Sequence, residues 1–451
     1  MDMLHGSIWD KLLKFALPIA ATGILGQLFN ASDIAIVGNF TGDFKTVAVA
    51  AVGANGPVIG LVLNLLMGLA LGANVTIATA VGSGDHAAVR KTVHTAVALS
   101  LVCGAAVAVL GELIAAALLR AMSIPEEVFP YALLYLRIYF LGMPVILLYN
   151  FAAAIFRSVG ETTVPLRALA LSGVLNVVLN LLFVVVFDMT VDGVAIATVI
   201  SNAVSAAVLL RRLIRTDSVI RFDIKSLRID RESAARIVRI GLPAGVQGAV
   251  FSVSNIVVQS ATNSLGTVVM AASSAALNIE IFVYYIFTSF AQGCTTFVGQ
   301  NCGAGNIKRC KRTFALAAAE GITATAAAAV LVLAAGRTLI AVFDSNPAVV
   351  KTGYIRLVMV FAGYAFSVVY EMTSGYMRGF GISLPPALLT MLGVCGVRIL
   401  WVHTVFPLDR TFRTLMLVYH VSLAATAVLM LGALAVCRPA RRFAGKENMN
   451  A

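Results

Sequence analysis

Residues 17–38, LPIAATGILGQLFNASDIAIVG, form an apolar run that is long enough to cross a bilayer as a helix and that contains one carboxylate, Asp33. A carboxylate at that depth is costly, so such residues usually face a cavity or a partner and mark the path of an ion or a substrate. Asp33 is therefore the first candidate functional residue of the chain.

The composition predicts an all-α integral membrane protein. Of the 451 residues, 60% are hydrophobic and 12% are charged, and the mean hydropathy is +0.93, which lies far outside the range of soluble domains. We expect twelve transmembrane helices. The expected spans are 12–38, 47–81, 93–119, 128–156, 164–187, 193–213, 235–262, 267–299, 313–335, 347–376, 384–405 and 414–437.

The basic residues are distributed unevenly between the two ends of these spans. Alternate connections and their flanks hold 24 of the 33 Lys and Arg residues, nine of them between Arg211 and Arg239. By the positive-inside rule, this bias predicts that both termini and the 211–239 connection are cytoplasmic. The same distribution accounts for the net charge of +12 without a nucleic-acid partner, and we predict none.

The second half of the chain repeats the first. GSGDHAAVRKT, which begins at Gly82, resembles GAGNIKRCKRT, which begins at Gly303, and the same offset of 221 relates Pro165 to Pro386. Six spans per half is an even number, so we expect two six-helix lobes related as parallel repeats, an arrangement typical of transporters that expose one site alternately to each side. The predicted lobes are 1–215 and 235–440, joined by a cytoplasmic linker, 216–234, and followed by a cytoplasmic tail, 441–451.

Polar side chains accompany the first-span carboxylate. Asn30 precedes it in the same span, and Gln27 lies one turn before Asn30 on about the same face as Asn30. Asn176 and Asn180 lie four residues apart in the fifth span, so their amides stack on one face, and Thr198 lies in the sixth span. Such oxygens could coordinate a small cation or relay a proton, and the alternative is that they hold helices together by hydrogen bonds.

The second half offers a different set of polar residues. Span seven contributes Asn255 and Gln259, and span eight places Glu280 one turn before Tyr284. An acid beside aromatic rings suits an organic cation, through charge pairing and ring faces, although an aromatic stripe alone is more often packing. We expect the substrate cavity to be lined by Gln27, Asn30, Asn255, Gln259, Glu280 and Tyr284.

Further charges lie in spans ten and eleven. Glu371 and Arg398 could neutralise one another, either as a structural ion pair or as part of a functional site. Arg356, near the start of span ten, lies within reach of the outer surface, which favours a structural role with its guanidinium at the interface.

Motifs for soluble chemistry are missing. The sequence has no phosphate loop of the GxxxxGK(S/T) type, no HExxH and no GxSxG, and its six cysteines form no CxxC pair. We therefore expect a protein that is not an enzyme, that has no cofactor and no metal site apart from a possible Na⁺ at Asp33, and that is driven by an ion gradient.

Four stretches resemble one known family: LPIAATGILGQLFNASDIAIVG, FRSVGETTVPLRALALSGVLNVVLN, FVGQNCGAGNIKRCKR and MRGFGISLPPALLTMLGVCGVRILW. They are similar to the multidrug and toxic compound extrusion (MATE) transporters of bacteria, over nearly the whole chain. The resemblance implies a monomer in the inner membrane, with two lobes around a V-shaped cavity, that exports cationic or amphipathic drugs in exchange for H⁺ or Na⁺. A flippase for lipid-linked saccharides of the same superfamily is the alternative, and it would favour a strongly cationic cavity.

The resemblance also implies roles for single residues. Asp33 is similar to the first-helix aspartate at the centre of the family's N-lobe cation site, and Asn176, Asn180 and Thr198 fall where its other members lie. Many relatives have an aspartate at the position of Asn180, so this chain has one formal charge fewer, which favours protonation of Asp33 over a fully coordinated Na⁺. Glu280 is similar to an acidic position of the eighth helix that belongs to the C-lobe cavity.

Overall fold

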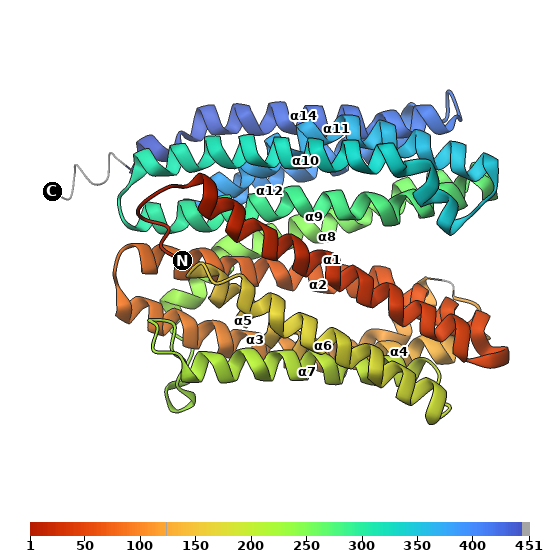
Figure 1. The fold of residues 1–451 in the computed structure, drawn as a ribbon, viewed down its shortest axis with the longest axis horizontal. Coiled ribbons are helices and arrows are strands. Elements are labelled where there is room, and N and C mark those ends of the chain that lie inside the picture. The colour runs from red at the N-terminus through yellow and green to blue at the C-terminus, as the bar shows by residue number, and fades with distance from the viewer. Residues whose placement is uncertain (123, 444–451) are drawn as a thin grey trace. The chain divides into compact units, whose positions relative to one another are not determined.

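The computed structural model describes residues 1–122 and 124–443, which form helices joined by short connections (Figure 1). Within this range eleven helices are long and apolar enough to cross a membrane, and α4 (Phe129–Leu141) with α5 (Met143–Ser158) forms a twelfth span that is bent by 50°. Pro144, in the first turn of α5, lacks a backbone N–H and so interrupts the helical hydrogen bonds at the bend. The all-α prediction with twelve spans is confirmed.

The remaining elements follow in chain order. They are α1 (Trp9–Phe40), η1 (Gly42–Phe44), α2 (Lys45–Gly82), α3 (His86–Ala121), α6 (Thr163–Leu181), η2 (Leu182–Val186), α7 (Val191–Arg215), η3 (Ile224–Ser226), α8 (Arg231–Asn263), α9 (Thr267–Gly303), α10 (Ile307–Phe343), α11 (Pro347–Gly379), α12 (Leu384–Thr390), η4 (Met391–Gly396), α13 (Val397–Thr404) and α14 (Phe412–Cys437). Two of the short elements, η2 and η4, are π-helical turns, which accommodate an extra residue within a helix and are frequent at functional sites.

The chain folds into two compact units. Unit 1 comprises Met1–Ala20, Gly82–Gly84 and the described part of residues 243–451, and unit 2 comprises Ala21–Val81 and Asp85–Leu242. The chain therefore passes from one unit to the other within α1 and again within α8. The lobes expected from the repeat, 1–215 and 235–440, stay a prediction, and residues 444–451 of the expected tail lie outside the described residues.

Each unit has its own apolar core. In unit 1, side chains of α1, α9, α10, α11 and α14 meet, and the rings of Phe15 and Phe297, which are fully buried, lie edge to face with centroids 5.8 Å apart. In unit 2, one cluster surrounds Phe151 between α2, α3, α5 and α7, and a second surrounds Phe140 between α1, α2, α3, α4 and α7. Burial of these side chains fixes the helices that carry the polar residues described below.

Two glycines let α2 and the start of α8 approach backbone to backbone in unit 2. A Cβ atom at Gly72 would lie 2.2 Å from the carbonyl oxygen of Ile237, and one at Gly241 would lie 2.6 Å from that of Gly68. Because these are backbone atoms of packed helices, a side chain here requires a helix to move. A Cβ atom at Gly60, also in α2, would meet nothing within 4 Å.

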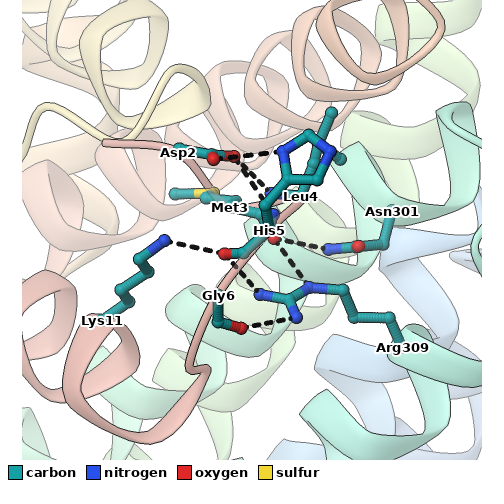
Figure 2. Close-up of polar contacts among 8 residues, drawn as sticks. All are labelled: Asp2, Met3, Leu4, His5, Gly6, Lys11, Asn301 and Arg309. Carbon is teal, nitrogen blue, oxygen red and sulfur yellow. Dashed lines mark hydrogen bonds and ion pairs between the residues drawn. The ribbon is translucent and has the colours of Figure 1, made fainter.

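The segment before α1 is held in unit 1 through its backbone carbonyl groups (Figure 2). Arg309, in the first turn of α10, donates hydrogen bonds of 2.8–3.1 Å to three of them, those of Met3, His5 and Gly6. Asn301 donates to the carbonyl oxygen of Met3 at 3.2 Å, and the Met3 side chain is fully buried. These first residues are therefore an integral part of the unit 1 fold.

Candidate functional site

Asp33 is buried in unit 2 and accepts hydrogen bonds from two other helices. It is 6% exposed and projects from the last third of α1. Asn180 of α6 donates through Nδ2 to Asp33 Oδ1 at 2.5 Å, and Thr198 of α7 donates through Oγ1 to Asp33 Oδ2 at 3.3 Å. Both carboxylate oxygens thus have a donor, as a buried charged group requires.

Asn176 completes a ring of hydrogen bonds around this carboxylate. Its Oδ1 atom accepts from Asn180 Nδ2 at 3.3 Å, and its Nδ2 atom donates to Thr198 Oγ1 at 3.4 Å. The four side chains therefore link α1, α6 and α7 in one closed network, which we call the Asp33 ring. The structure brings together the four residues that the sequence analysis grouped, and their role in ion coupling stays a prediction.

One acceptor of the Asp33 ring is left unused. The Oδ1 atom of Asn180 is buried and has no hydrogen-bond partner among the described residues. A buried carbonyl oxygen without a donor costs free energy, so this atom is suited to a ligand that it can share with Asp33, either a proton donor or a small cation. The side chains of the Asp33 ring supply one carboxylate and three neutral side-chain oxygen atoms.

Two tyrosines near the Asp33 ring were missed by the sequence analysis. Tyr135 and Tyr139 of α4 both interact electrostatically with Asp33, and their rings stack with centroids 6.2 Å apart. Their spacing of four residues, which places both on one face of a helix, was the available signal. On α1 itself, Gln27 is half-buried and Asn30 is exposed, and Asn30 takes no part in the ring.

Glu280 forms a buried ion pair in unit 1. Its Oε2 atom accepts from Arg356 Nη2 at 3.0 Å and from Arg356 Nε at 3.2 Å, and its Oε1 atom accepts from the hydroxyl of Tyr364 at 3.2 Å. Arg356 is 3% exposed and also donates to Ser273 at 2.9 Å and to Tyr419 at 3.3 Å. The expectation that Arg356 reaches the outer surface is therefore wrong, because a buried carboxylate compensates its charge.

This pairing changes what Glu280 can do. Its charge is compensated by Arg356, so in this structure the carboxylate is not available to an organic cation. The neighbouring Tyr284 is half-buried and packs its ring against Phe287, with centroids 5.2 Å apart. Glu280, which was predicted to line the substrate cavity, is thus paired with Arg356, and the aromatic rings near it pack against one another.

Arg398 and Glu371 do not pair with one another in the described residues. Arg398, which is 2% exposed, donates to Asn255 Oδ1 at 2.9 Å and to Ser422 at 3.4 Å, and its guanidinium lies 4.6 Å from the ring centroid of Tyr419. Arg398 therefore interacts with neutral acceptors and an aromatic ring, and not with the carboxylate of Glu371 that the sequence suggested.

Two further predicted residues have local partners. The cation that acts on Glu371 is Arg378, which lies on the same helix. Gln259 donates to Asn263 at the end of α8, at 2.8 Å. Neither contact connects these residues to the Glu280 pair.

Comparison with known proteins identifies the family. A family model described as MatE matches residues 18–182 and 243–402, which together include most of the spans and three members of the Asp33 ring. The chain belongs to the MatE family. The match supports the resemblance drawn from the four sequence stretches.

Relatives of this MatE protein cover nearly its full length. It is 28% identical over 397 residues to a probable multidrug resistance protein, YpnP, of Bacillus subtilis, covering 87% of each chain. It is 24% identical over 400 residues to another, YoeA, of the same organism, covering 87% of this chain and 86% of the relative. A solved structure, described as the outward-facing conformation of a multidrug resistance MATE family transporter, matches with a TM-score of 0.87 at 20% identity, covering 97% of this chain and 98% of the other, which establishes the shared fold.

Proposed function

We propose that this MatE protein is a secondary antiporter that exports cationic or amphipathic drugs in exchange for protons by alternating access. Several relatives carry names of multidrug resistance or multidrug export proteins. The observation that carries the coupling proposal is the Asp33 ring, in which one buried carboxylate is held by neutral donors alone.

Protonation of Asp33 would change the hydrogen bonds of the ring. The ionised carboxylate only accepts, whereas the protonated group must also donate one hydrogen bond. The buried Oδ1 atom of Asn180 could accept it if the Asn180 amide turned over. Because the ring joins α1, α6 and α7, proton binding would alter how these helices are linked, which is the response that a coupled transporter needs.

Na⁺ is the second possible coupling ion. Asp33 would be its one anionic ligand, and Asn176, Asn180 and Thr198 would supply neutral oxygens. We favour the proton because it requires a single carboxylate, whereas Na⁺ in this ring would lack a second anionic ligand.

Efflux of a fluorescent cation from cells tests the role of Asp33. Asp33→Asn removes the ionisable group while keeping the shape of the side chain, so we expect efflux to fall to the background of cells without the transporter. The matched control is Asp188→Asn, because Asp188 is exposed and has a positive φ of 56°, which asparagine tolerates. Wild-type efflux by Asp33→Asn, at normal expression, would contradict the coupling role.

Transport by purified protein in lipid vesicles separates the two ions. We expect uptake of the cation to follow an imposed proton gradient in the absence of Na⁺. Transport that follows only an imposed Na⁺ gradient would contradict the proton assignment and leave the antiport proposal intact.

A flippase for lipid-linked saccharides is the competing function. The buried Arg398, whose partners are neutral, is the feature that would suit an anionic substrate group. The names of the relatives do not favour it. Restored envelope growth in a flippase-deficient strain, without any drug phenotype, would support the flippase over the exporter.

The setting of the proposed transporter follows from the same observations. The chain is a multi-pass bacterial membrane protein, and we propose that it acts as a monomer with both termini in the cytoplasm, as the distribution of Lys and Arg indicates. Its proposed partners are small molecules and the lipid bilayer.

A further inference from the structure

Glu320 is a buried carboxyl group in α10 of unit 1 that has no hydrogen-bond donor. The residue is 4% exposed, and both Oε1 and Oε2 are buried without a partner among the described residues. The other deeply buried acids differ, since Asp33 accepts from two residues and Glu280 accepts from Arg356 and Tyr364. Glu320 is therefore the buried acid whose charge the described protein does least to stabilise.

The helices packed against α10 are apolar beside this position. Gly321, the next residue, faces Phe290 of α9 and both Val368 and Met372 of α11. A Cβ atom at Gly321 would lie 2.8 Å from Met372 Cε and 3.3 Å from Val368 Cγ1, so this surface is closely packed. This surface next to Glu320 is hydrocarbon, and the Glu320 oxygens themselves have no donor among the described residues.

The third helix at this place, α1, contributes a like charge. Asp10, in its first turn, acts on Glu320 through its charge, and its own side chain is 45% exposed with Lys14 Nζ 3.6 Å away. The following turn of α1 is seated on α9, where a Cβ atom at Gly293 would lie 3.3 Å from the ring of Phe15. Asp10 is thus a partly exposed acidic group whose charge acts on the buried carboxyl.

An ionised carboxylate cannot persist in such surroundings without a large cost in free energy. Burial of a carboxylate without a donor is strongly unfavourable, and a nearby like charge adds to the cost. The group must therefore be neutralised by a proton or by a bound cation. A metal ion needs several ligands, and the described residues contain no group of three or more His, Cys, Asp and Glu that could hold one, whereas a proton needs neither a cavity nor further ligands.

We propose that Glu320 is a proton-binding site of unit 1, separate from the Asp33 ring, and that Asp10 is the carboxylate through which Glu320 exchanges its proton with water. In the exchange, the Glu320 O–H bond breaks, the proton moves to Asp10 or to water beside it, and Glu320 is left as a carboxylate. The inference goes beyond the proposed antiport, because it depends neither on a substrate nor on the role of Asp33.

The site would link protonation to the seating of α1. When Glu320 is neutral, the start of α1 rests on α9 without charge repulsion between Asp10 and Glu320. When Glu320 ionises, its buried charge and the like charge of Asp10 repel one another, and the seated position becomes less favourable. The same helix continues into unit 2 and carries Asp33, so α1 would respond to protons at two places along its length.

Infrared spectroscopy of the full-length protein in lipid tests the proposal. We expect the wild type to show a band of a protonated carboxyl group that is lost reversibly as pH rises, and we expect this band to be missing from Glu320→Gln at every pH. The matched control is Glu112→Gln, because Glu112 is already paired with Arg137 at 3.4 Å, and it should leave the band in place. Asp10→Asn should lose the band at lower pH, since the like charge that opposes ionisation is gone.

Several outcomes would overturn the proposal. A spectrum of Glu320→Gln that matches the wild type at every pH means that Glu320 carries no exchanging proton. A Glu320 band that persists at every pH means that the proton is fixed and serves only the fold. If Glu320→Gln does not yield folded protein, Glu320→Asp should shift the same band, and an unshifted band refutes the assignment. Asp33→Asn keeps the Glu320 band whether or not it transports, so failure of the antiport proposal and failure of this one are distinguishable.

Discussion

Removing one member of the Glu280–Arg356 pair should have unequal effects, depending on which member is removed. Glu280→Gln leaves a buried guanidinium, which cannot lose its charge, beside neutral acceptors. Breaking a buried pair in this way typically costs about 3–5 kcal/mol of the free energy of unfolding. Arg356 would keep its hydrogen bonds to Ser273 and Tyr419, so we expect a loss near the lower end, roughly 3 kcal/mol.

Arg356→Met leaves a buried group that can become neutral, whereas Glu280→Gln does not. In Arg356→Met the remaining carboxyl group can take up a proton and keep its hydrogen bond with Tyr364. We therefore expect a smaller loss, about 1–2 kcal/mol, that shrinks further as pH falls, because acid favours the neutral form. The double variant has no unpaired charge, so it should lose about as much as Arg356→Met alone, well below the sum of the single losses.

Unfolding in mixed micelles measures these differences. Trp401, whose indole N–H donates to the carbonyl oxygen of Thr414 at 2.9 Å, lies in unit 1 and reports on α13 and α14 when Trp9 is replaced by Phe. Two results would refute the reasoning: a loss below about 1 kcal/mol for Glu280→Gln, or a double variant that loses the sum of the two single variants. A loss for Glu280→Gln that changes strongly with pH would also count against a permanently charged Arg356.

Three further predictions address other parts of the molecule. Asn180→Asp places a second carboxylate beside Asp33, so transport in vesicles should gain a dependence on Na⁺ concentration, and an unchanged response would contradict the argument from charge number. Gly72→Ala should cost about 1–3 kcal/mol of unfolding free energy because its Cβ atom meets the backbone of α8, whereas Gly60→Ala in the same helix should stay within about 1 kcal/mol of the wild type, and equal losses would show that the close approach is not limiting. Asp230 caps α8 by accepting from the backbone N–H and the hydroxyl of Ser233, and these hydrogen bonds hold the pKa of its carboxyl below the usual range. The stabilisation that this cap gives is therefore present above the ordinary aspartate pKa and is lost as pH falls through the lowered pKa of the folded state. Amide hydrogen exchange at the start of α8, corrected for intrinsic rates, should increase on acidification in the wild type. It should not increase in Asp230→Asn.

The sequence was sufficient to predict the fold and which four residues lie together around Asp33, because both leave local or repeated signals. Long apolar runs give the spans, and the offset between the halves gives the duplication. At the Asp33 ring, the spacing of Asn176 and Asn180 places both amides on one face of a helix, and the family resemblance supplies Thr198. Each of these signals can be read without knowing which helices touch.

The partners of the buried charges in unit 1 could not be predicted in the same way. Glu280 and Arg356 are 76 positions apart, and Arg398 and Asn255 are 143 apart. Helical periodicity says which residues share a face but not which other helix that face meets. Glu371 and Arg398 have opposite charges in neighbouring spans, yet packing gives Arg398 an amide, a hydroxyl and an aromatic ring instead.

Glu320 shows a signal that was present and overlooked. It is the one acid in the run LAAAEGITATAAAA, residues 316–329. Like Asp33, it therefore has a high free-energy cost inside a membrane span. Its isolation from donors, however, is a property of three packed helices and could not be seen in the sequence. The free-energy cost of a carboxylate inside a membrane span identifies Glu320 in the sequence. Only the fold shows that no donor stabilises its charge.

The π-helical turn η4 bears on how the two halves of the chain have diverged since their duplication. The offset of 221 holds as far as Pro165 and Pro386, just before η4 begins at Met391. Both copies of this span contain a π-helical turn, η2 after Asn180 and η4 before Trp401, which is the residue 221 positions after Asn180. A wider turn rotates the residues beyond it relative to those before it, so turns at different places change which side chains share a face. A π turn placed differently in the two copies can thus give each one its own set of inward-facing side chains while the span itself survives, and the Asp33 ring of one half need not have a counterpart in the other.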